Sequence, residues 1–324
     1  MKNMLEVRDL YVYFQNNVHL NKALEQVSFT AEKGEIIGLV GESGCGKSLT
    51  SLSIMGLLPE NAVCSGQIEI GGKEFLSLPE EEKCAIRGKE ISMIFQEPMT
   101  ALNPLVPVGR QIAETYAVHH SCTRAKANGE ALLIMKKVGL SRAGSLFHEY
   151  PHQLSGGMKQ RIIIAMALIN SPGLLIADEP TTALDVTIQL QILELIKGLN
   201  KEFSSTVLLI SHDLGVVKEI CTRVLVMYGG FIVEEGGTAE ILGGPLHPYT
   251  QKLLFSIPSA SRKGQPLHSI PGIVAPLSKR REGCCPFCDR CSEAKEICFQ
   301  AVPEIQTIGT RRVRCHLAGG EMIG

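Results

Sequence analysis

The pattern of hydrophobic and polar positions divides the first part of the chain into short strands and helices. Residues 5–14 and 23–35 alternate apolar and polar side chains with a period of two, which predicts antiparallel strands. The short apolar run EIIGLVG at 35–41 is typical of a strand covered on both faces. Apolar residues then recur with helical spacing over 48–58, so we expect a helix there.

A helical pattern dominates from about residue 97 to about residue 165. Beyond it, predicted helices at 160–170 and 186–203 alternate with predicted strands at 174–178 and 206–213. Strands that alternate with helices indicate a parallel sheet, and hence an α/β fold.

After Gly244 the apolar residues no longer recur with a helical or a strand period, because six prolines from Pro245 to Pro276 interrupt the pattern. We therefore predict a first domain at 1–244, with a helical subdomain at about 97–165 and an antiparallel β-subdomain near the N-terminus. A C-terminal extension at 245–324 would follow.

Composition and charge exclude several classes of protein. With 44% hydrophobic residues the chain has enough apolar side chains for a packed core, and its formal net charge of −1 gives no overall basic field. We expect no nucleic-acid partner. No apolar run approaches the roughly 20 residues that cross a bilayer, and no secretory signal is visible. We therefore expect the chain to stay in the cytoplasm and to reach a membrane only through partner proteins.

A glycine-rich segment between the apolar strand and the following helix matches the phosphate-binding pattern G-x-x-x-x-G-K-S/T. Its glycines allow the backbone N–H groups to point at phosphate oxygens, and the helix N-terminus adds a favourable dipole. The lysine would reach the β- and γ-phosphates, and the last serine would ligate Mg²⁺. The residues are Gly41, Glu42, Ser43, Gly44, Cys45, Gly46, Lys47 and Ser48.

The predicted strand LLIAD ends in two carboxylates, Asp178 and Glu179. The carboxyl ends of parallel strands are where nucleotides bind in open α/β sheets. Asp178 is suited to the Mg²⁺ shell, and Glu179 is placed to orient and deprotonate an attacking water. By itself this pair is a weak signal, since acidic residues often end strands; with the phosphate-binding loop it indicates nucleotide hydrolysis.

A second anion cradle lies in LSGGMKQR, where Ser155, Gly156 and Gly157 stand at a predicted helix start. A hydroxyl, bare backbone N–H groups and a helix dipole favour a phosphate there, although a glycine-softened helix cap explains the same residues equally well. One chain with two cradles and a single lysine loop suggests that the second cradle serves a nucleotide held by another subunit.

LSGGMKQR is similar to the signature motif of the ABC ATPase family, and the other motifs resemble that family in order and spacing over residues 5 to about 240. The resemblance implies roles for further residues. It assigns Gln96 to Mg²⁺ and the lytic water, and His212 to the γ-phosphate. It places Asp185 at the seam between two ATPase subunits and Phe14 against the adenine, although a core position for Phe14 is nearly as plausible.

The family resemblance also implies partners. They are a second, homologous ATPase subunit in a heterodimer, two transmembrane permeases and an extracytoplasmic solute-binding protein, with this chain on the cytoplasmic face of the membrane. A DNA-repair ABC ATPase would need long coiled-coil heptads, a ribosome-acting one two cassettes in one chain, and an exporter commonly fused membrane spans. A P-loop kinase does not account for LSGGMKQR or His212.

HPYTQKLL at 247–254, together with the cysteine-rich tail, resembles the peptide and nickel importer branch of the family. The resemblance implies an importer ATPase for dipeptides or oligopeptides, with nickel or a metallophore as the alternative cargo. We interpret His247 and Tyr249 themselves as turn residues after Pro245.

Six of the eleven cysteines lie between Cys284 and Cys315. In a reducing cytosol such a cluster indicates metal binding before disulfides. Spacing alone nominates the C-x-x-C-x-x-C run of Cys285, Cys288 and Cys291. The importer branch instead implies Cys285, Cys291, Cys298 and Cys315 as ligands, flanked by Phe287 and Arg290. We expect an iron–sulfur cluster of the 4Fe–4S type, with Zn²⁺ as the alternative.

Overall fold

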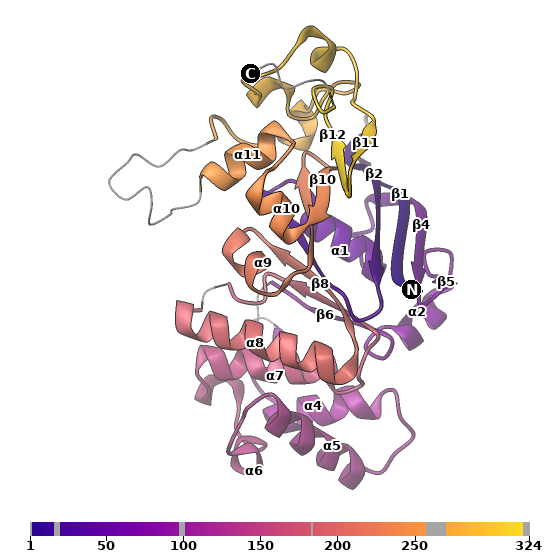
Figure 1. Cartoon of the computed structure of the whole chain (residues 1–324). Helices are drawn as coiled ribbons and strands as arrows, with labels where there is room; N and C mark the ends of the chain where they lie inside the picture. The colour runs from indigo at the N-terminus through magenta and orange to yellow at the C-terminus, as the bar shows by residue number, and fades with distance from the viewer. Residues whose placement is uncertain (1, 16–19, 97–100, 183, 257–269, 320–324) are drawn as a thin grey trace. The chain divides into compact units, whose positions relative to one another are not determined.

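A computed structural model describes residues 2–15, 20–96, 101–182, 184–256 and 270–319 (Figure 1). These residues form two compact units, each assembled from several segments of the chain. The first unit holds residues 1–5, 31–36 and 69–210. The second holds residues 6–30, 37–68 and 211–324.

The sheet of the first unit contains three parallel strands, β6 (Ile91–Ile94), β7 (Leu174–Asp178) and β8 (Thr206–Ser211). Every residue of β6 and β7 is buried, which explains their continuously apolar sequences, because parallel strands are covered on both faces. β7 and β8 run where the sequence predicts strands; β6 follows no predicted strand. The parallel pairing confirms the predicted α/β class.

Helices α2 (Glu80–Ile86), α4 (Val108–Ala117), α5 (Arg124–Lys137), α6 (Ala143–Leu146), α7 (Gly156–Leu168) and α8 (Val186–Phe203) complete the first unit. α4, α5 and α7 pack on one another, as Figure 1 shows (magenta). Their buried residues, such as Ile112, Ala131 and Ile164, follow the helical spacing of the sequence. The long α8 buries Ile192, Leu193 and Ile196.

The second unit contains β3 (Ile36–Val40), β9 (Arg223–Tyr228) and β10 (Phe231–Gly237) as neighbouring strands. β3 and β9 are parallel, whereas β9 and β10 form an antiparallel pair that shifts register between Ile232 and Glu234. The sequence analysis predicts β3 but neither β9 nor β10. Short helices α9 (Leu214–Ile220) and α10 (Thr238–Gly243) flank these strands in the sequence.

Most of β1 (Asn3–Gln15), β2 (Leu20–Glu32) and β4 (Ala62–Ile70) also belongs to the second unit, in the spatial order β2-β1-β4. The last residues of β4 pair antiparallel with β5 (Lys73–Glu74) in the first unit. Apolar residues such as Leu5, Val7 and Phe29 point inward from β1 and β2, which confirms the predicted alternation. Helix α1 (Lys47–Met55) follows β3.

The C-terminal segment contributes to the sheet of the second unit. Strands β11 (Ile305–Ile308) and β12 (Arg311–Arg314) form an antiparallel hairpin, and β12 pairs with β10 through Glu234–Val313 and Glu235–Arg312 (Figure 1). Before them stand α11 (Pro248–Phe255) and a short 3₁₀ turn at Cys288–Arg290. The tail therefore shares a sheet with β3, the strand that leads into the phosphate-binding loop.

Among the residues that the structure describes, no helix is both long and apolar enough to cross a membrane.

Candidate nucleotide site and its neighbours

The phosphate-binding loop joins β3 to α1 in the second unit, as the sequence predicts. Two of its glycines are required by geometry. A Cβ on Gly41 would lie 2.2 Å from the Met227 carbonyl oxygen, and Gly46, which precedes α1, has a φ of +116° that other residues rarely adopt. The loop backbone thus lies close against β9, and at Gly41 no side chain can be accommodated.

Lys47 begins α1 and is 6% exposed, with its ammonium turned back along the loop. Nζ donates to the carbonyl oxygens of Gly41 at 2.7 Å and Glu42 at 3.1 Å. Ser48 follows it at the start of the helix and is exposed. A compact cation and an accessible hydroxyl at a helix N-terminus fit an anion and its Mg²⁺.

Cys45 is fully buried inside the loop, between the exposed Gly44 and the half-buried Gly46. Burial raises the pKa of its thiol, and the nearby Lys47 charge offsets only part of this rise. Because the thiolate is the reactive form, Cys45 acts as a packing residue of the loop and not as a nucleophile.

Three residues of the C-terminal segment contact this loop. The hydroxyl of Tyr249 accepts a hydrogen bond from the Glu42 N–H at 2.9 Å. Arg290 forms a two-pronged ion pair with the Glu42 carboxylate, with Nη1–Oε2 at 2.7 Å and Nη2–Oε1 at 3.1 Å. Arg280 donates from Nη2 to the Gly44 carbonyl oxygen at 2.9 Å. The interpretation of Tyr249 as a turn residue is wrong, because it lies in α11, and no local pattern in the sequence indicates these contacts.

The HPY motif, residues 247–249, forms the start of α11. His247 is the N-cap, and its Nδ1 accepts from the Tyr249 N–H at 3.0 Å. Buried Glu234 on β10 accepts from the backbone N–H groups of Leu246 and His247. Burial lowers the pKa of His247 to about 3, so the imidazole is neutral at physiological pH. The motif thus orients Tyr249 toward the phosphate-binding loop.

The first unit contains a compact group around Glu179. Gln96 Nε2 donates to Glu179 Oε2 at 3.1 Å, and Thr182 Oγ1 donates to the same oxygen at 3.0 Å. Glu179 has a φ of +47°, unusual for a residue with a side chain, and its N–H is held by the Ile210 carbonyl oxygen at 2.9 Å. Such backbone strain, of order 1–3 kcal/mol, is typical of functional sites. The preceding Asp178 is 3% exposed at the end of β7.

The LSGGMKQR segment lies in the first unit and has the helix start that its sequence predicts. Ser155 caps α7, with Oγ accepting from the Met158 N–H, and both Ser155 and Gly156 are exposed. A Cβ on Gly157 would meet Ile188 on α8 at 3.0 Å, so this glycine also serves helix packing. Buried Gln160 donates to the Pro180 carbonyl oxygen at 2.6 Å and so ties α7 to the Glu179 turn.

The remaining predicted site residues occupy separate places. Asp185 is exposed and caps α8 through the Ile188 N–H. His212 is exposed directly after β8, and Phe14 is half-buried on β1. The exposed Ser43, in the phosphate-binding loop, and His212 both belong to the second unit, whereas Gln96, Asp178 and Glu179 belong to the first. The sequence predicts that the residues of both units form a single catalytic site, and that site stays a prediction.

The four cysteines expected to bind a metal lie near one another in the tail. Burial, and after it the charges of Cys298, Cys315 and Cys291, raise the pKa of Cys285 to about 12, although a backbone hydrogen bond from Phe287 lowers it in part. The Cys285 N–H also donates to the Cys298 carbonyl oxygen at 2.9 Å. Cys284 and Cys288 form a second pair, with Sγ atoms 3.9 Å apart. Because the charge of Cys285 also raises the pKa of Cys288, both sets of ligands stay predictions.

Within the described parts of the chain, no three or more His, Cys, Asp or Glu side chains are arranged to hold a metal ion. The predicted iron–sulfur cluster and its zinc alternative are therefore not supported by the arrangement of the thiols.

Comparison with known proteins agrees with the motifs. Residues 24–182 match the ABC transporter family, and residues 233–298 match the C-terminal region of oligopeptide/dipeptide transporters. The oligopeptide transport ATP-binding protein AppD of Bacillus subtilis (strain 168) is 47% identical over 98% of this chain and 97% of its own length. The dipeptide transport ATP-binding protein DppD of Haemophilus influenzae is 44% identical over 97% and 95%.

A solved structure shows the same fold. The dimeric structure of MJ0796, a bacterial ABC transporter cassette, has a TM-score of 0.65 and is 28% identical over 72% of this chain and 99% of its own.

The chain belongs to the ABC transporter ATP-binding family, whose members hydrolyse ATP to power transport. Within that family its C-terminal segment and its relatives place it in the oligopeptide and dipeptide branch. The family resemblance seen in the sequence is thereby confirmed.

Proposed function

We propose that this chain is the ATP-hydrolysing subunit of a peptide importer, acting at the cytoplasmic face of the membrane. The observation that carries the proposal is the pairing of an intact phosphate-binding loop with a C-terminal segment of the oligopeptide/dipeptide type. The relatives are named for oligopeptide and dipeptide transport, and none of those cited is named for nickel. Peptides are therefore favoured over the nickel or metallophore alternative.

In the proposed reaction the loop from Gly41 to Ser48 binds the phosphates of ATP through its N–H groups and Lys47. Ser48, Gln96 and Asp178 would hold Mg²⁺, which when bound offsets negative charge on the phosphates. Glu179 accepts a proton from the attacking water, and Gln96 keeps its carboxylate oriented. His212 stabilises charge at the γ-phosphate, and Phe14 stacks on the adenine. Catalysis then consists mainly of positioning and charge stabilisation.

The second nucleotide cradle supports an assembly of two ATPase subunits. Ser155 and Gly156 are exposed at the N-terminus of α7, a helix of 13 residues, where a phosphate from a partner can be received. Asp185 would lie at the seam. The MJ0796 cassette, which shares the fold, is described as dimeric. We propose a heterodimer with a homologous ATPase, joined to two permeases and served by an extracytoplasmic solute-binding protein.

We further propose that Cys285, Cys291, Cys298 and Cys315 bind a 4Fe–4S cluster. The resemblance of the C-terminal segment to the importer branch is the basis for this set. Thiols must lose their protons to bind metal, so the cluster would stabilise a charge state that burial disfavours. Anaerobic purification with assays of iron, sulfide and zinc tests the idea. Colourless protein with stoichiometric zinc, or with no metal, would contradict it.

Transport is tested in the native host. Deleting the gene for this chain should abolish uptake of labelled di- to pentapeptides and leave nickel uptake unchanged, and the wild-type chain should restore peptide uptake whereas Glu179→Gln should not. Loss of nickel uptake with normal peptide uptake would assign the chain to the alternative cargo.

A further inference from the structure

All three polar groups of Glu42, the second residue of the phosphate-binding loop, are engaged within the second unit. Its N–H donates to Tyr249, its carbonyl oxygen accepts from Lys47, and its carboxylate pairs with Arg290. Two of these three partners lie more than 200 residues away, in the C-terminal segment. A single loop residue thus links the nucleotide site to the tail.

Arg290 is anchored independently of the loop. Its Nε donates to the Pro271 carbonyl oxygen at 2.8 Å, and Nη2 donates to those of Ile270 and Gly272 at 3.3 and 3.1 Å. The side chain is only 7% exposed, against 28% for Glu42. Although burial lowers the pKa of Arg290, its hydrogen bonds to Glu42 and Tyr228 raise it above the ordinary value, so it remains charged. The tail therefore fixes Arg290, and Arg290 fixes Glu42.

Tyr249 is held by aromatic packing. Its ring is fully buried against Tyr228, at a centroid distance of 4.6 Å, and against Phe287, at 5.4 Å. Phe287 lies one residue before the 3₁₀ turn that carries Arg290, and Lys252 of α11 donates to the Arg290 carbonyl oxygen at 3.0 Å. The hydroxyl of Tyr249 and the guanidinium of Arg290 thus come from one packed cluster.

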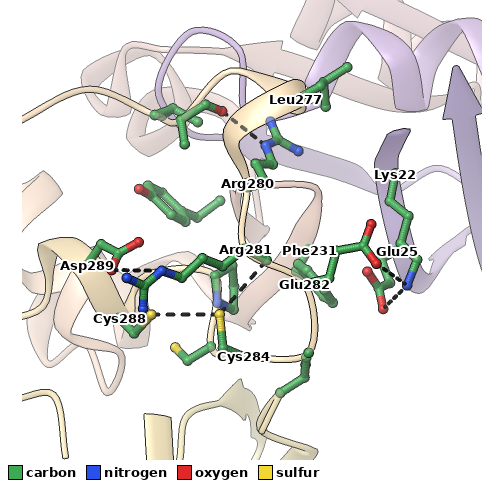
Figure 2. A pocket seen from close by; sticks show the side chains of 18 of the residues that line it. Lys22, Glu25, Phe231, Leu277, Arg280, Arg281, Glu282, Cys284, Cys288 and Asp289 are labelled. Atoms are coloured by element: carbon green, nitrogen blue, oxygen red, sulfur yellow. Dashed lines mark hydrogen bonds and ion pairs between the residues drawn. The ribbon is translucent and has the colours of Figure 1, made fainter. Parts of the chain in front are cut away.

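Arg280 makes a third contact from another part of the tail. Besides the Gly44 carbonyl oxygen it reaches those of Ala275 and Ala23. Figure 2 shows it on one side of a cavity of about 90 Å³, with Cys284 and Cys288 on another side. The second and fourth residues of the loop are therefore each held by an arginine from the C-terminal segment.

We propose that Arg290, Tyr249 and Arg280 are positioning residues of the ATP site, which clamp the phosphate-binding loop in the form that receives the nucleotide. A loop that is already held in place does not have to be ordered when ATP binds, so affinity rises. Loss of the clamp frees the loop backbone and weakens ATP binding, although none of the three residues touches the reacting atoms.

Substitution of Glu42 separates this clamp from a simple charge effect. Removal of a carboxylate beside a phosphate site would strengthen the binding of an anion if charge alone mattered. The clamp predicts the opposite sign for Glu42→Gln. Arg290→Lys keeps the positive charge and removes the two-pronged geometry. Arg281→Lys is the matched control, because Arg281 belongs to the same segment but is 61% exposed, with Asp289 at 3.8 Å.

The experiment measures the Kd of the full-length chain for a fluorescent MgATP analogue, with the Tm of each nucleotide-free variant recorded beside it. Glu42→Gln and Arg290→Lys should each raise Kd about tenfold, and their double variant no further, because both break the same charged hydrogen bonds. Tyr249→Phe, which removes only a hydroxyl, should raise Kd about threefold. Arg281→Lys should bind like the wild type. In the assembled transporter the KM for ATP should change more than kcat.

Three results would overturn the proposal: wild-type Kd in Glu42→Gln and Arg290→Lys, tighter binding in Glu42→Gln, or losses that multiply in the double variant. If Arg290→Lys does not fold, the near-isosteric Glu42→Gln and Tyr249→Phe still decide the matter, because their Tm values show whether a weaker affinity merely follows instability.

Discussion

Gln96 and Glu179 are 83 residues apart in the sequence, yet the Gln96 side chain donates to the Glu179 carboxylate at 3.1 Å. Gln96 follows β6 and Glu179 follows β7, and these strands are parallel neighbours. Because parallel strands end at the same edge of a sheet, the topology alone brings the two side chains together. This hydrogen bond couples Glu179, the proposed general base, to Gln96.

Glu179→Gln should retain ATP binding and lose most turnover. The phosphate-binding loop is untouched, whereas an amide cannot accept the proton of the attacking water; loss of a general base typically costs about 10²- to 10⁴-fold in rate. Steady-state ATPase assays of the assembled transporter, together with nucleotide binding, measure both effects. Gln96→Glu places a second carboxylate against Glu179, and its rate shows how turnover responds to the charge beside the proposed base. Turnover at the wild-type rate in Glu179→Gln would show that the base is another residue.

Lys47→Ala should weaken ATP binding itself. The ammonium that now lies on the Gly41 and Glu42 carbonyl oxygens is the one loop cation placed to reach the phosphates in the described part of the loop. Loss of a charge-assisted hydrogen bond of this kind corresponds to about 10- to 100-fold in Kd. Titration with a fluorescent ATP analogue measures it, and Lys47→Arg tests whether charge alone suffices. An unchanged Kd in Lys47→Ala would remove this lysine from the site.

The isolated chain should hydrolyse ATP slowly, and its rate should rise when the second ATPase and the permeases are added. Ser155→Asp is a sharp probe, because aspartate still caps α7 but places a negative charge where the partner's phosphate would lie. We expect this chain's own Kd for ATP to be preserved while ATPase activity of the assembly falls. A strictly monomeric preparation with full activity would contradict the trans arrangement.

Stability should fall as the pH drops below about 6.5, partly because of His247. Its folded-state pKa is lowered to about 3 by burial, whereas the unfolded chain binds a proton near pH 6.5. Between these values the unfolded state binds more protons, so the free energy of unfolding decreases toward acid by up to about 1.4 kcal/mol per pH unit. Above pH 6.5 this contribution is fully present.

Urea unfolding at pH 7.0 and 5.5 measures that slope. His247→Asn is the matched variant, because asparagine also caps a helix but does not titrate. The variant should lose less stability between the two pH values than the wild type does. Equal slopes would mean that His247 takes up its proton in the folded chain as it does in the unfolded one, contrary to its burial beside Phe287, whose ring centroid is 6.0 Å away.

Much of the fold follows from local patterns in the sequence. Period-two alternation gives β1 and β2, apolar runs give β3 and β7, and helical spacing gives α5 and α8. These elements have a single dominant face or none, so burial can be inferred from neighbours in the sequence. The C-terminal segment is different. The prolines after Gly244 interrupt the period, so no local pattern predicts α11, β11 or β12. These elements are held by packing on Phe287 and by pairing with β10.

The candidate site was predictable where a motif is contiguous and unpredictable where it is not. The loop from Gly41 to Ser48 and the cap at Ser155 follow directly from residue type and spacing. Glu179, with its positive φ, is hydrogen-bonded through its N–H to the Ile210 carbonyl oxygen. The hydrogen bonds to Glu42 come from residues 207 and 248 positions away. No local pattern carries such contacts.

The distance in sequence between Glu42 and Arg290 also sets an order of events during translation. The loop leaves the ribosome 248 residues before the arginine that holds it. At synthesis rates of about 5–20 residues per second, roughly 12 to 50 seconds separate the two. A nascent chain therefore carries an unclamped loop until Arg290 has been made, and full affinity for ATP is reached only after that point.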